Sequence, residues 1–311
     1  MRDTGLRDYL ELSRPYTLLA PAVGGFVFSW WGSLDSGSSF SAAFPKILLV
    51  CMTLAMANYV GNVINQVFDR EIDSDSPAKR NRPIPSGRVS VDGAMSFAWV
   101  LTLSSASFSF VLIGSFYGIL FSTILIFTWL YSSPPLRLRS KLFLSNLSIA
   151  FPRGGLGVLT AYSSFNNPLS NQYLLMVSLT LGVFVFFTNT LKDFEDKEVD
   201  ARYGVRNFVT VFGDKASSIL VMFGFVAVPL ILSSTYGFLY APPSWFSSSL
   251  VVVSVTSIIA VVAMFIWTRF RDSYGWKMDR LMWRVFYGYF LLLIIALTPA
   301  WNALLEQLTF L

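Results

Sequence analysis

Residues 62–87 read NVINQVFDREIDSDSPAKRNRPIPSG, and the organisation of the whole chain follows from this stretch. It ends a long apolar run and places Asn65, Asp69 and Asp73 at four-residue intervals. Side chains at i, i+4 and i+8 share one face of a helix. A basic segment bounded by prolines, residues 79–82, follows at once. Carboxylates beside a membrane-spanning segment are costly to place and usually functional, so we expect this face to hold a ligand.

The composition is typical of a membrane protein. Of the 311 residues, 54% are hydrophobic and 13% are charged, whereas a soluble domain carries roughly 25% charged residues. The single cysteine, Cys51, excludes an intramolecular disulfide, and the absence of histidine excludes imidazole from acid–base chemistry and metal binding. The pI near 9.3 could indicate nucleic-acid binding, but the basic residues lie in short loops between apolar runs. We therefore expect a membrane partner and no nucleic acid.

Apolar runs long enough to span a bilayer recur along the chain. A hydrocarbon core of about 30 Å needs roughly 17–25 such residues per helix. The N-terminal segment is charged and lacks a small-residue cleavage site, so the first run is expected to be a span and not a removed signal. We predict an all-α polytopic membrane protein, one domain over residues 1–311, with nine spans at residues 16–32, 46–65, 94–112, 114–131, 143–163, 172–191, 216–235, 246–267 and 286–305.

The loops alternate in charge and set the predicted orientation. Of the 23 basic residues, 21 lie in the N-terminal segment or in the loops after the second, fourth, sixth and eighth spans. The two exceptions are Lys46 and Arg153. The positive-inside rule therefore predicts a cytoplasmic N-terminus and an active cytoplasmic face. The basic residues at 269–284 are expected to lack an acidic partner face, and we interpret them as topology determinants.

A second acidic segment, TNTLKDFEDKEVDARYGVRN at residues 188–207, follows the sixth span. Asp193, Asp196 and Asp200 stand at i, i+3 and i+7, one stripe of a helix. Carboxylates without nearby histidine or cysteine suit a hard cation, and magnesium fits better than zinc. A single segment of this kind is more often a solvated helix end; two on one side of the membrane, each followed by basic residues, favour a site.

The basic residues near both segments could contact phosphate oxygens that the metal leaves uncovered. Together with the carboxylates they predict a metal-bridged diphosphate as substrate or leaving group. The alternative is that they only determine topology. The candidates are Lys79, Arg82, Arg139, Lys141, Lys192 and Arg206.

Arg153 is different, because it lies about eleven residues inside the fifth predicted span, in the segment FPRGG. An unpaired charge there is costly. It could have a structural partner, such as a helix-terminal carbonyl or an asparagine of the bundle, or it could contact a polar or anionic second substrate. Asn58 and Asn62 on the second span could likewise join helices or line a site.

Four segments are similar to the UbiA superfamily of intramembrane prenyltransferases. They are LSRPYTLLAP (12–21), NQVFDREIDSDSPAKRNRPIPSG (65–87), YSSPPLRLRSK (131–141) and KDFEDKEVDARYG (192–204). The resemblance implies a nine-helix bundle around a central cavity that opens sideways to lipid. It also implies that an isoprenyl diphosphate binds through two Mg²⁺ ions.

The resemblance assigns roles residue by residue. Asn65, Asp69 and Asp73 match the first metal motif of the family, and Asp196 and Asp200 match the second. Asp193 matches a position that is acidic in several branches. The basic loop associated with the diphosphate is matched by Arg137, Arg139 and Lys141.

The expected reaction transfers an isoprenyl group to a lipophilic acceptor through ionisation of the allylic C–O bond. Asp69, Asp73, Asp196 and Asp200 would support catalysis through the metals. The allylic cation needs a π-rich wall, for which Tyr131 and Tyr162 are candidates. The acceptor is expected to be a lipid phosphate such as geranylgeranylglyceryl phosphate, or an aromatic quinone precursor, and Arg153 suits an anionic one.

Two other membrane functions use ionisable residues. A secondary transporter places them near the bilayer midplane, whereas these carboxylates lie at span ends. A CDP-alcohol phosphotransferase has an Asp-Gly closely followed by Ala-Arg before its later aspartates. Here Asp92-Gly93 comes after the acidic cluster and is followed by AMSF. The sequence favours the prenyltransferase.

Overall fold

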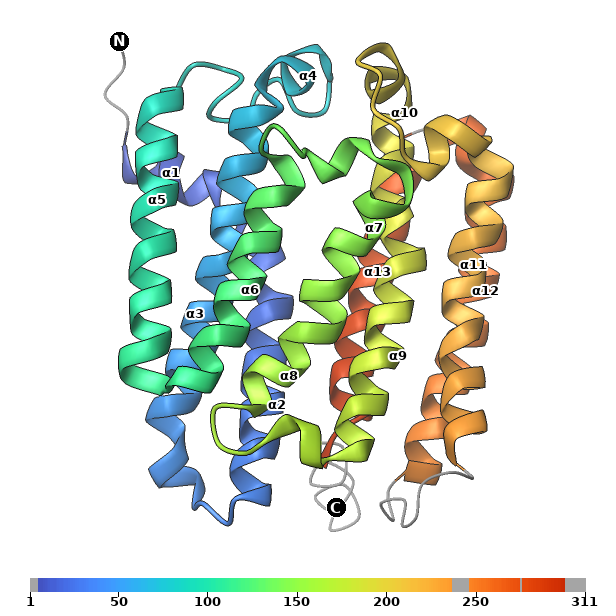
Figure 1. Ribbon diagram of the computed structural model, residues 1–311. Coiled ribbons are helices and arrows are strands. Elements are labelled where there is room, and N and C mark those ends of the chain that lie inside the picture. The colour runs from blue at the N-terminus through green and yellow to red at the C-terminus, as the bar shows by residue number, and fades with distance from the viewer. Residues whose placement is uncertain (1–4, 237–245, 275, 300–311) are drawn as a thin grey trace.

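The computed structural model describes residues 5–236, 246–274 and 276–299, and every regular element in this part is helical. Long helices run up and down through one bundle (Figure 1). The α-helices are α1 (Leu6–Leu12), α2 (Leu19–Asp35), α3 (Phe40–Phe68), α4 (Arg70–Asp75), α5 (Val91–Phe108), α6 (Ser115–Ser132), α7 (Leu142–Ala150), α8 (Gly157–Tyr162), α9 (Gln172–Thr188), α10 (Asp193–Arg202), α11 (Phe208–Tyr236), α12 (Phe246–Tyr274) and α13 (Trp276–Ala296). Short 3-10 or π turns are η1 (Pro15–Leu18), η2 (Ser109–Ile113), η3 (Leu138–Ser140), η4 (Phe151–Leu156), η5 (Pro168–Ser170) and η6 (Asn189–Lys192).

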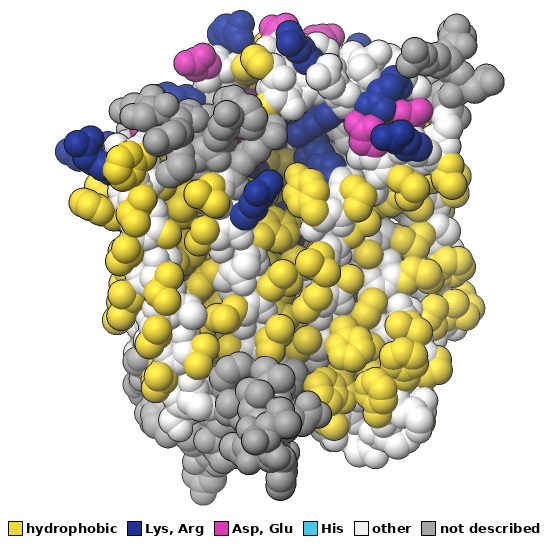
Figure 2. Space-filling view, turned by 180° about the vertical axis from the view of Figure 1, so that it is seen from behind, with side chains coloured by type: hydrophobic (Ala, Val, Ile, Leu, Met, Phe, Trp, Pro, Cys, Tyr) yellow, Lys and Arg dark blue, Asp and Glu magenta, His cyan; other side chains and the backbone are white. Residues whose placement is uncertain are grey.

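The bundle has the surface of a membrane protein. In the described residues, 8 helical segments are long and apolar enough to cross a bilayer, and α13 adds a shorter apolar stretch, Leu281–Ala296. Hydrophobic side chains cover the sides of the molecule, and charged ones gather at one end (Figure 2). The predicted ninth span, 286–305, overlaps α13 but continues beyond residue 299, outside the described residues.

Both acidic segments follow a change in helix geometry at the same end of the bundle. The chain leaves α3 at Asp69, where φ is −103° and ψ is 12°, and continues directly into α4. Likewise, α9 tightens into η6 before α10 begins at Asp193. Figure 1 shows α4 and α10 at this end, together with the connection from α6 to α7. Gly114 separates η2 from α6, so the predicted spans 94–112 and 114–131 are divided at this point.

Glycines allow the helices around the centre to approach closely. A Cβ atom on Gly32 of α2 would lie 2.6 Å from the carbonyl oxygen of Tyr162 in α8. On Gly154 of η4 it would lie 2.5 Å from the carbonyl oxygen of Leu181 in α9. Small residues at such contacts are typical of packing between membrane helices, where lipid supplies little hydrophobic driving force. The contact at Gly154 fixes η4, and therefore Arg153, against α9.

Candidate active site

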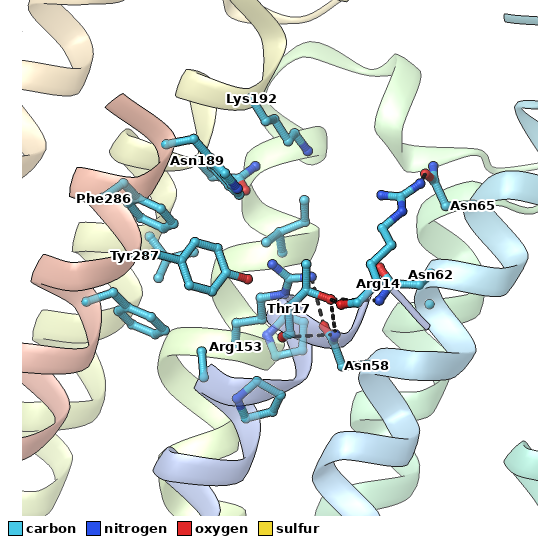
Figure 3. Close-up of a pocket in the computed structure, with 18 of the residues that line it drawn as sticks. Arg14, Thr17, Asn58, Asn62, Asn65, Arg153, Asn189, Lys192, Phe286 and Tyr287 are labelled. Atoms are coloured by element: carbon cyan, nitrogen blue, oxygen red, sulfur yellow. Dashed lines mark hydrogen bonds between the residues drawn. The ribbon is translucent and has the colours of Figure 1, made fainter. Parts of the chain in front are cut away.

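A cavity of about 950 Å³ lies within the bundle. Its walls come mainly from α2, α3, α6, α7–α8, α9 and α13. Charged side chains of the two acidic segments line the end that carries α4 and α10, whereas the deeper part combines aromatic side chains such as Phe286 and Tyr287 with the polar Arg153, Asn58 and Thr17 (Figure 3). The chamber therefore combines a charged mouth with an interior in which aromatic and aliphatic side chains surround one further polar group, and this suits a substrate that has a charged head and a hydrocarbon tail.

Asp69 is the buried centre of the first acidic motif. It is 0% exposed, and Asn65 donates a hydrogen bond to it from one turn earlier. Arg137 reaches it from the α6–α7 connection, with Nη2 2.8 Å from Oδ1. Arg139, from the same connection, contacts the other carboxylate oxygen. A guanidinium pair so close to one buried carboxylate holds the α6–α7 connection over the end of α3.

Arg139 also joins the first motif to the second. Its Nη2 lies 3.0 Å from Oδ1 of Asp200, and the amide of Asn207 donates to Oδ2 of the same carboxylate at 3.0 Å. Lys79 makes the matching link between the other two aspartates: its Nζ contacts Asp196 and lies 4.0 Å from Asp73.

Arg82 completes this arrangement, with Nη1 2.7 Å from Oδ2 of Asp73. The structure therefore brings Asp69, Asp73, Asp196 and Asp200 together, because two cations each contact one aspartate of the first motif and one of the second. The sequence predicted these four carboxylates together with the cations Lys79, Arg82 and Arg139, and the resemblance added Arg137.

Lys192 and Asp193 lie where η6 meets α10, at the edge of the cavity. Lys192 Nζ is 2.6 Å from the hydroxyl of Tyr131 and 4.9 Å from its ring centroid. Oδ2 of Asp193 is buried without a hydrogen-bond partner, and so is the amide nitrogen of Asn189. Both residues line the cavity, so these two atoms are free to bind a polar ligand there.

These residues fit magnesium. The described residues contain no group of three or more acidic, histidine or cysteine side chains converging on one point. Mg²⁺ does not require such a cage, because it is usually held by one or two carboxylates together with waters and substrate phosphates. Asp69 and Asp73 with Asn65, and Asp196 and Asp200 with Asp193, supply two such oxygen sets. Each ion would have to displace an arginine or lysine from its carboxylate.

Arg14 is a site residue that the sequence reasoning did not single out. It precedes η1, its Nη2 donates to Oδ1 of Asn65 at 3.4 Å, and its Nε is buried without a partner. Burial lowers the pKa of Arg14 to about 10, with a smaller contribution from Arg82, so it stays charged at neutral pH.

Arg14 and Arg137 are also the two non-glycine residues with positive φ in the described chain, at 49° and 38°. Such conformations are strained and persist where the surroundings impose them, often at functional sites. In the sequence, the only sign that Arg14 belongs to the site was its place in the segment LSRPYTLLAP, as the basic loop was for Arg137.

Other predicted residues lie elsewhere. Lys141 and Arg206 line a separate surface hollow, and in the described structure neither forms an ion pair with the four aspartates. Tyr131 faces the cavity, whereas Tyr162 is fully buried at the far end of the bundle, where its hydroxyl donates to Asp35 at 2.6 Å. Arg153 enters the cavity and donates to Oδ1 of Asn58 at 3.0 Å.

The expectation that Arg271 lacks an acidic partner was wrong. Its guanidinium lies 2.6 Å from Asp214 and 2.9 Å from Asp279, and it donates to the carbonyl of Phe194 in α10 at 3.1 Å. Asp214 belongs to α11, far away in the sequence, and Asp279 stands alone in α13 without the helical spacing of the two acidic motifs, so neither was recognised as a partner. Arg271 connects α12 to the helix that carries the second acidic motif.

Comparison with known proteins gives a consistent result. Residues 18–294 match the model of the UbiA prenyltransferase family. A digeranylgeranylglyceryl phosphate synthase of Methanobrevibacter smithii is 30% identical over 264 residues, covering 82% of this chain and 85% of that protein. A 2-acylphloroglucinol 4-prenyltransferase of Humulus lupulus is 29% identical, covering 70% and 55% respectively. The structure of a UbiA homologue from Archaeoglobus fulgidus bound to DMAPP and Mg²⁺ superposes with a TM-score of 0.67 at 16% identity, over 92% of this chain and 99% of that one.

Proposed function

Because the chain belongs to the UbiA prenyltransferase family, it is a membrane prenyltransferase, and we propose that its two acidic motifs act as one site for an isoprenyl diphosphate. The observation that carries this proposal is the pair of shared cations, Arg139 between Asp69 and Asp200, and Lys79 between Asp73 and Asp196. Four carboxylates and several cations around one cavity mouth suit a ligand that is itself an anion bridged by metals.

The cations and the apolar cavity would have different roles in transfer. The bond between the allylic carbon and the diphosphate oxygen breaks, and its electron pair leaves with the diphosphate. Arg82, Arg139 and Lys79 stabilise this developing charge because they are already placed at the mouth. The acceptor oxygen or ring carbon supplies the electron pair of the new bond and loses a proton. The deeper cavity excludes water from the allylic cation, and the Tyr131 ring faces it.

Magnesium is the metal that the donor set favours. We propose two Mg²⁺ ions, one held by Asn65, Asp69 and Asp73 and the other by Asp193, Asp196 and Asp200, and when bound they would neutralise charge on the diphosphate oxygens. The relative from Archaeoglobus fulgidus was solved with DMAPP and Mg²⁺, which supports this choice.

The acceptor is proposed to be a lipid phosphate, with an aromatic quinone precursor as the alternative. The relative named digeranylgeranylglyceryl phosphate synthase supports the first, and the 2-acylphloroglucinol 4-prenyltransferase supports an aromatic acceptor. The distribution of basic loops supports placing the acidic end of the bundle in the cytoplasm. The long isoprenyl tail can then remain in the bilayer while its head reacts at the membrane surface.

The test is an acceptor screen. Membranes containing the protein are incubated with labelled geranylgeranyl diphosphate, Mg²⁺ and one of several acceptors, including geranylgeranylglyceryl phosphate and 4-hydroxybenzoate. We expect one labelled, magnesium-dependent product. Membranes without the protein provide the control, and absence of product with every acceptor would contradict the proposal.

A further inference from the structure

Arg153 lies in the cavity without an acidic partner. It belongs to the spanning segment Leu142–Tyr162, where a charge is costly unless something compensates for it. Among the described residues it forms no ion pair, and its hydrogen bond goes to the neutral amide of Asn58 at 3.0 Å. The side chain is exposed although the neighbouring Pro152 and Gly154 are buried, so the cavity itself reaches it.

The orientation of Arg153 is fixed on both sides. Oδ1 of Asn58 accepts from Arg153, while Nδ2 of the same amide donates to the carbonyl and to the hydroxyl of Thr17 at 3.2 and 3.1 Å. The amide therefore cannot rotate without losing two hydrogen bonds. Behind the arginine, η4 is a π turn packed on α9 at Gly154, and such turns are frequent at functional sites. Figure 3 shows Tyr287 of α13 reaching toward Arg153 across the cavity.

Arg153 lies deeper in the cavity than the acidic motifs. Its partner Asn58 precedes Asp69 by eleven residues on α3, which corresponds to about 16 Å along the helix axis. The acidic motifs also have cations of their own for a diphosphate, Lys79 and Arg82, so Arg153 is left for another group. An anion at Arg153 would therefore belong to a second molecule in the same cavity.

We propose that Arg153, positioned by Asn58, binds the anionic group of the acceptor, a phosphate or carboxylate, inside the membrane-spanning part of the cavity. This inference rests on the proposed prenyl transfer and specifies its second substrate: an acceptor with an anionic group is preferred over its neutral analogue. A guanidinium suits this task because it offers two parallel donors to an oxyanion.

The experiment compares wild-type protein with Arg153→Gln and Arg153→Lys. Transfer from labelled geranylgeranyl diphosphate is measured with geranylgeranylglyceryl phosphate and with the neutral geranylgeranylglycerol, and in a second arm with 4-hydroxybenzoate and its amide. We expect Arg153→Gln to raise KM for the anionic acceptor by about 10- to 100-fold, as for loss of a charge-assisted hydrogen-bond pair, and to abolish the preference over the neutral analogue. Arg153→Lys should restore part of the preference. If wild type prefers the phosphate over geranylgeranylglycerol, the bound anion is a phosphate. If it prefers 4-hydroxybenzoate over the amide, the bound anion is a carboxylate.

Two controls separate a binding role from a structural one. KM for geranylgeranyl diphosphate should stay within about twofold in Arg153→Gln, because its site lies at the mouth. Arg70→Gln, which removes an exposed cation that pairs with Glu71 at 3.7 Å, should change neither KM. Equal losses with anionic and neutral acceptors, or a retained preference in Arg153→Gln, would overturn the inference while leaving prenyl transfer intact.

A binding measurement covers the case in which transfer itself fails. Geranylgeranylglyceryl phosphate or 4-hydroxybenzoate alone should raise the thermal unfolding temperature of wild type and not that of Arg153→Gln. Absence of any product from wild type would count against the proposed function, and equal stabilisation of both proteins would count against the role of Arg153. If Arg153→Gln does not fold, Asn58→Ala is used instead, and it should raise KM for the anionic acceptor several-fold.

Discussion

Replacing Arg139 with glutamine tests whether the two acidic motifs depend on a shared cation. The arginine contacts Asp69 and lies 3.0 Å from Asp200, and these carboxylates are 0% and 2% exposed. Two unit charges at that distance interact by roughly 5 kcal/mol at an effective dielectric constant of 20. Removing one partner of a buried pair typically costs about 3–5 kcal/mol, because it leaves an uncompensated charge. Arg137 still pairs with Asp69, so we expect the lower end of that range.

The assay is thermal unfolding of the purified protein in detergent, with and without MgCl₂. A loss of about 3 kcal/mol should lower Tm by roughly 6 °C for a chain of this size. Mg²⁺ can replace the missing guanidinium between the carboxylates, so it should raise the Tm of Arg139→Gln more than that of wild type. Arg80→Gln removes an exposed cation nearby and should behave as wild type in both conditions. An unchanged Tm, or the same magnesium effect in Arg139→Gln and wild type, would refute the reasoning.

Three further outcomes follow from the structure. Arg271→Gln should destabilise the protein by about 2–4 kcal/mol and increase hydrogen exchange in α10, because Asp279 loses its buried partner; unchanged exchange would contradict a positioning role. Gly154→Leu should prevent the contact of η4 with α9 and lower both Tm and transfer, whereas Gly5→Leu, at a position with no atom within 4 Å, should be tolerated; equal effects would argue against close packing. Chelation of divalent cations with EDTA should abolish prenyl transfer, and Mg²⁺ should restore it; transfer that persists in EDTA would exclude a metal requirement.

The position of the site could be predicted because its signals are local. Asn65, Asp69 and Asp73 repeat at helical spacing at the end of an apolar run, and backbone hydrogen bonds from Asp69 to Asn65 and from Asp73 to Asp69 preserve that spacing across the break between α3 and α4. The same reasoning located the second motif. Positive charge in alternate loops correctly indicated that cations and carboxylates would meet at one end of the bundle.

The pairing of charges could not be predicted, because it depends on how distant segments fold over one another. Arg139 contacts residues 70 positions before it and 61 after it, and Arg271 contacts Asp214 from another helix 57 positions away. Span ends were also displaced for a physical reason. Hydropathy locates the membrane core, whereas a helix continues as long as its backbone is hydrogen-bonded, so α13 begins at Trp276, ten residues before the predicted 286–305.

The most direct test of the central claim is magnesium-dependent prenyl transfer by Asp69→Ala and Asp196→Ala, one aspartate from each motif. Labelled geranylgeranyl diphosphate is supplied in membranes, and folding is checked by monodispersity in detergent. If both motifs hold one metal-bridged diphosphate, each variant should lose about 100-fold or more of its transfer rate while remaining folded. Unchanged transfer by both variants would contradict the assignment of the site.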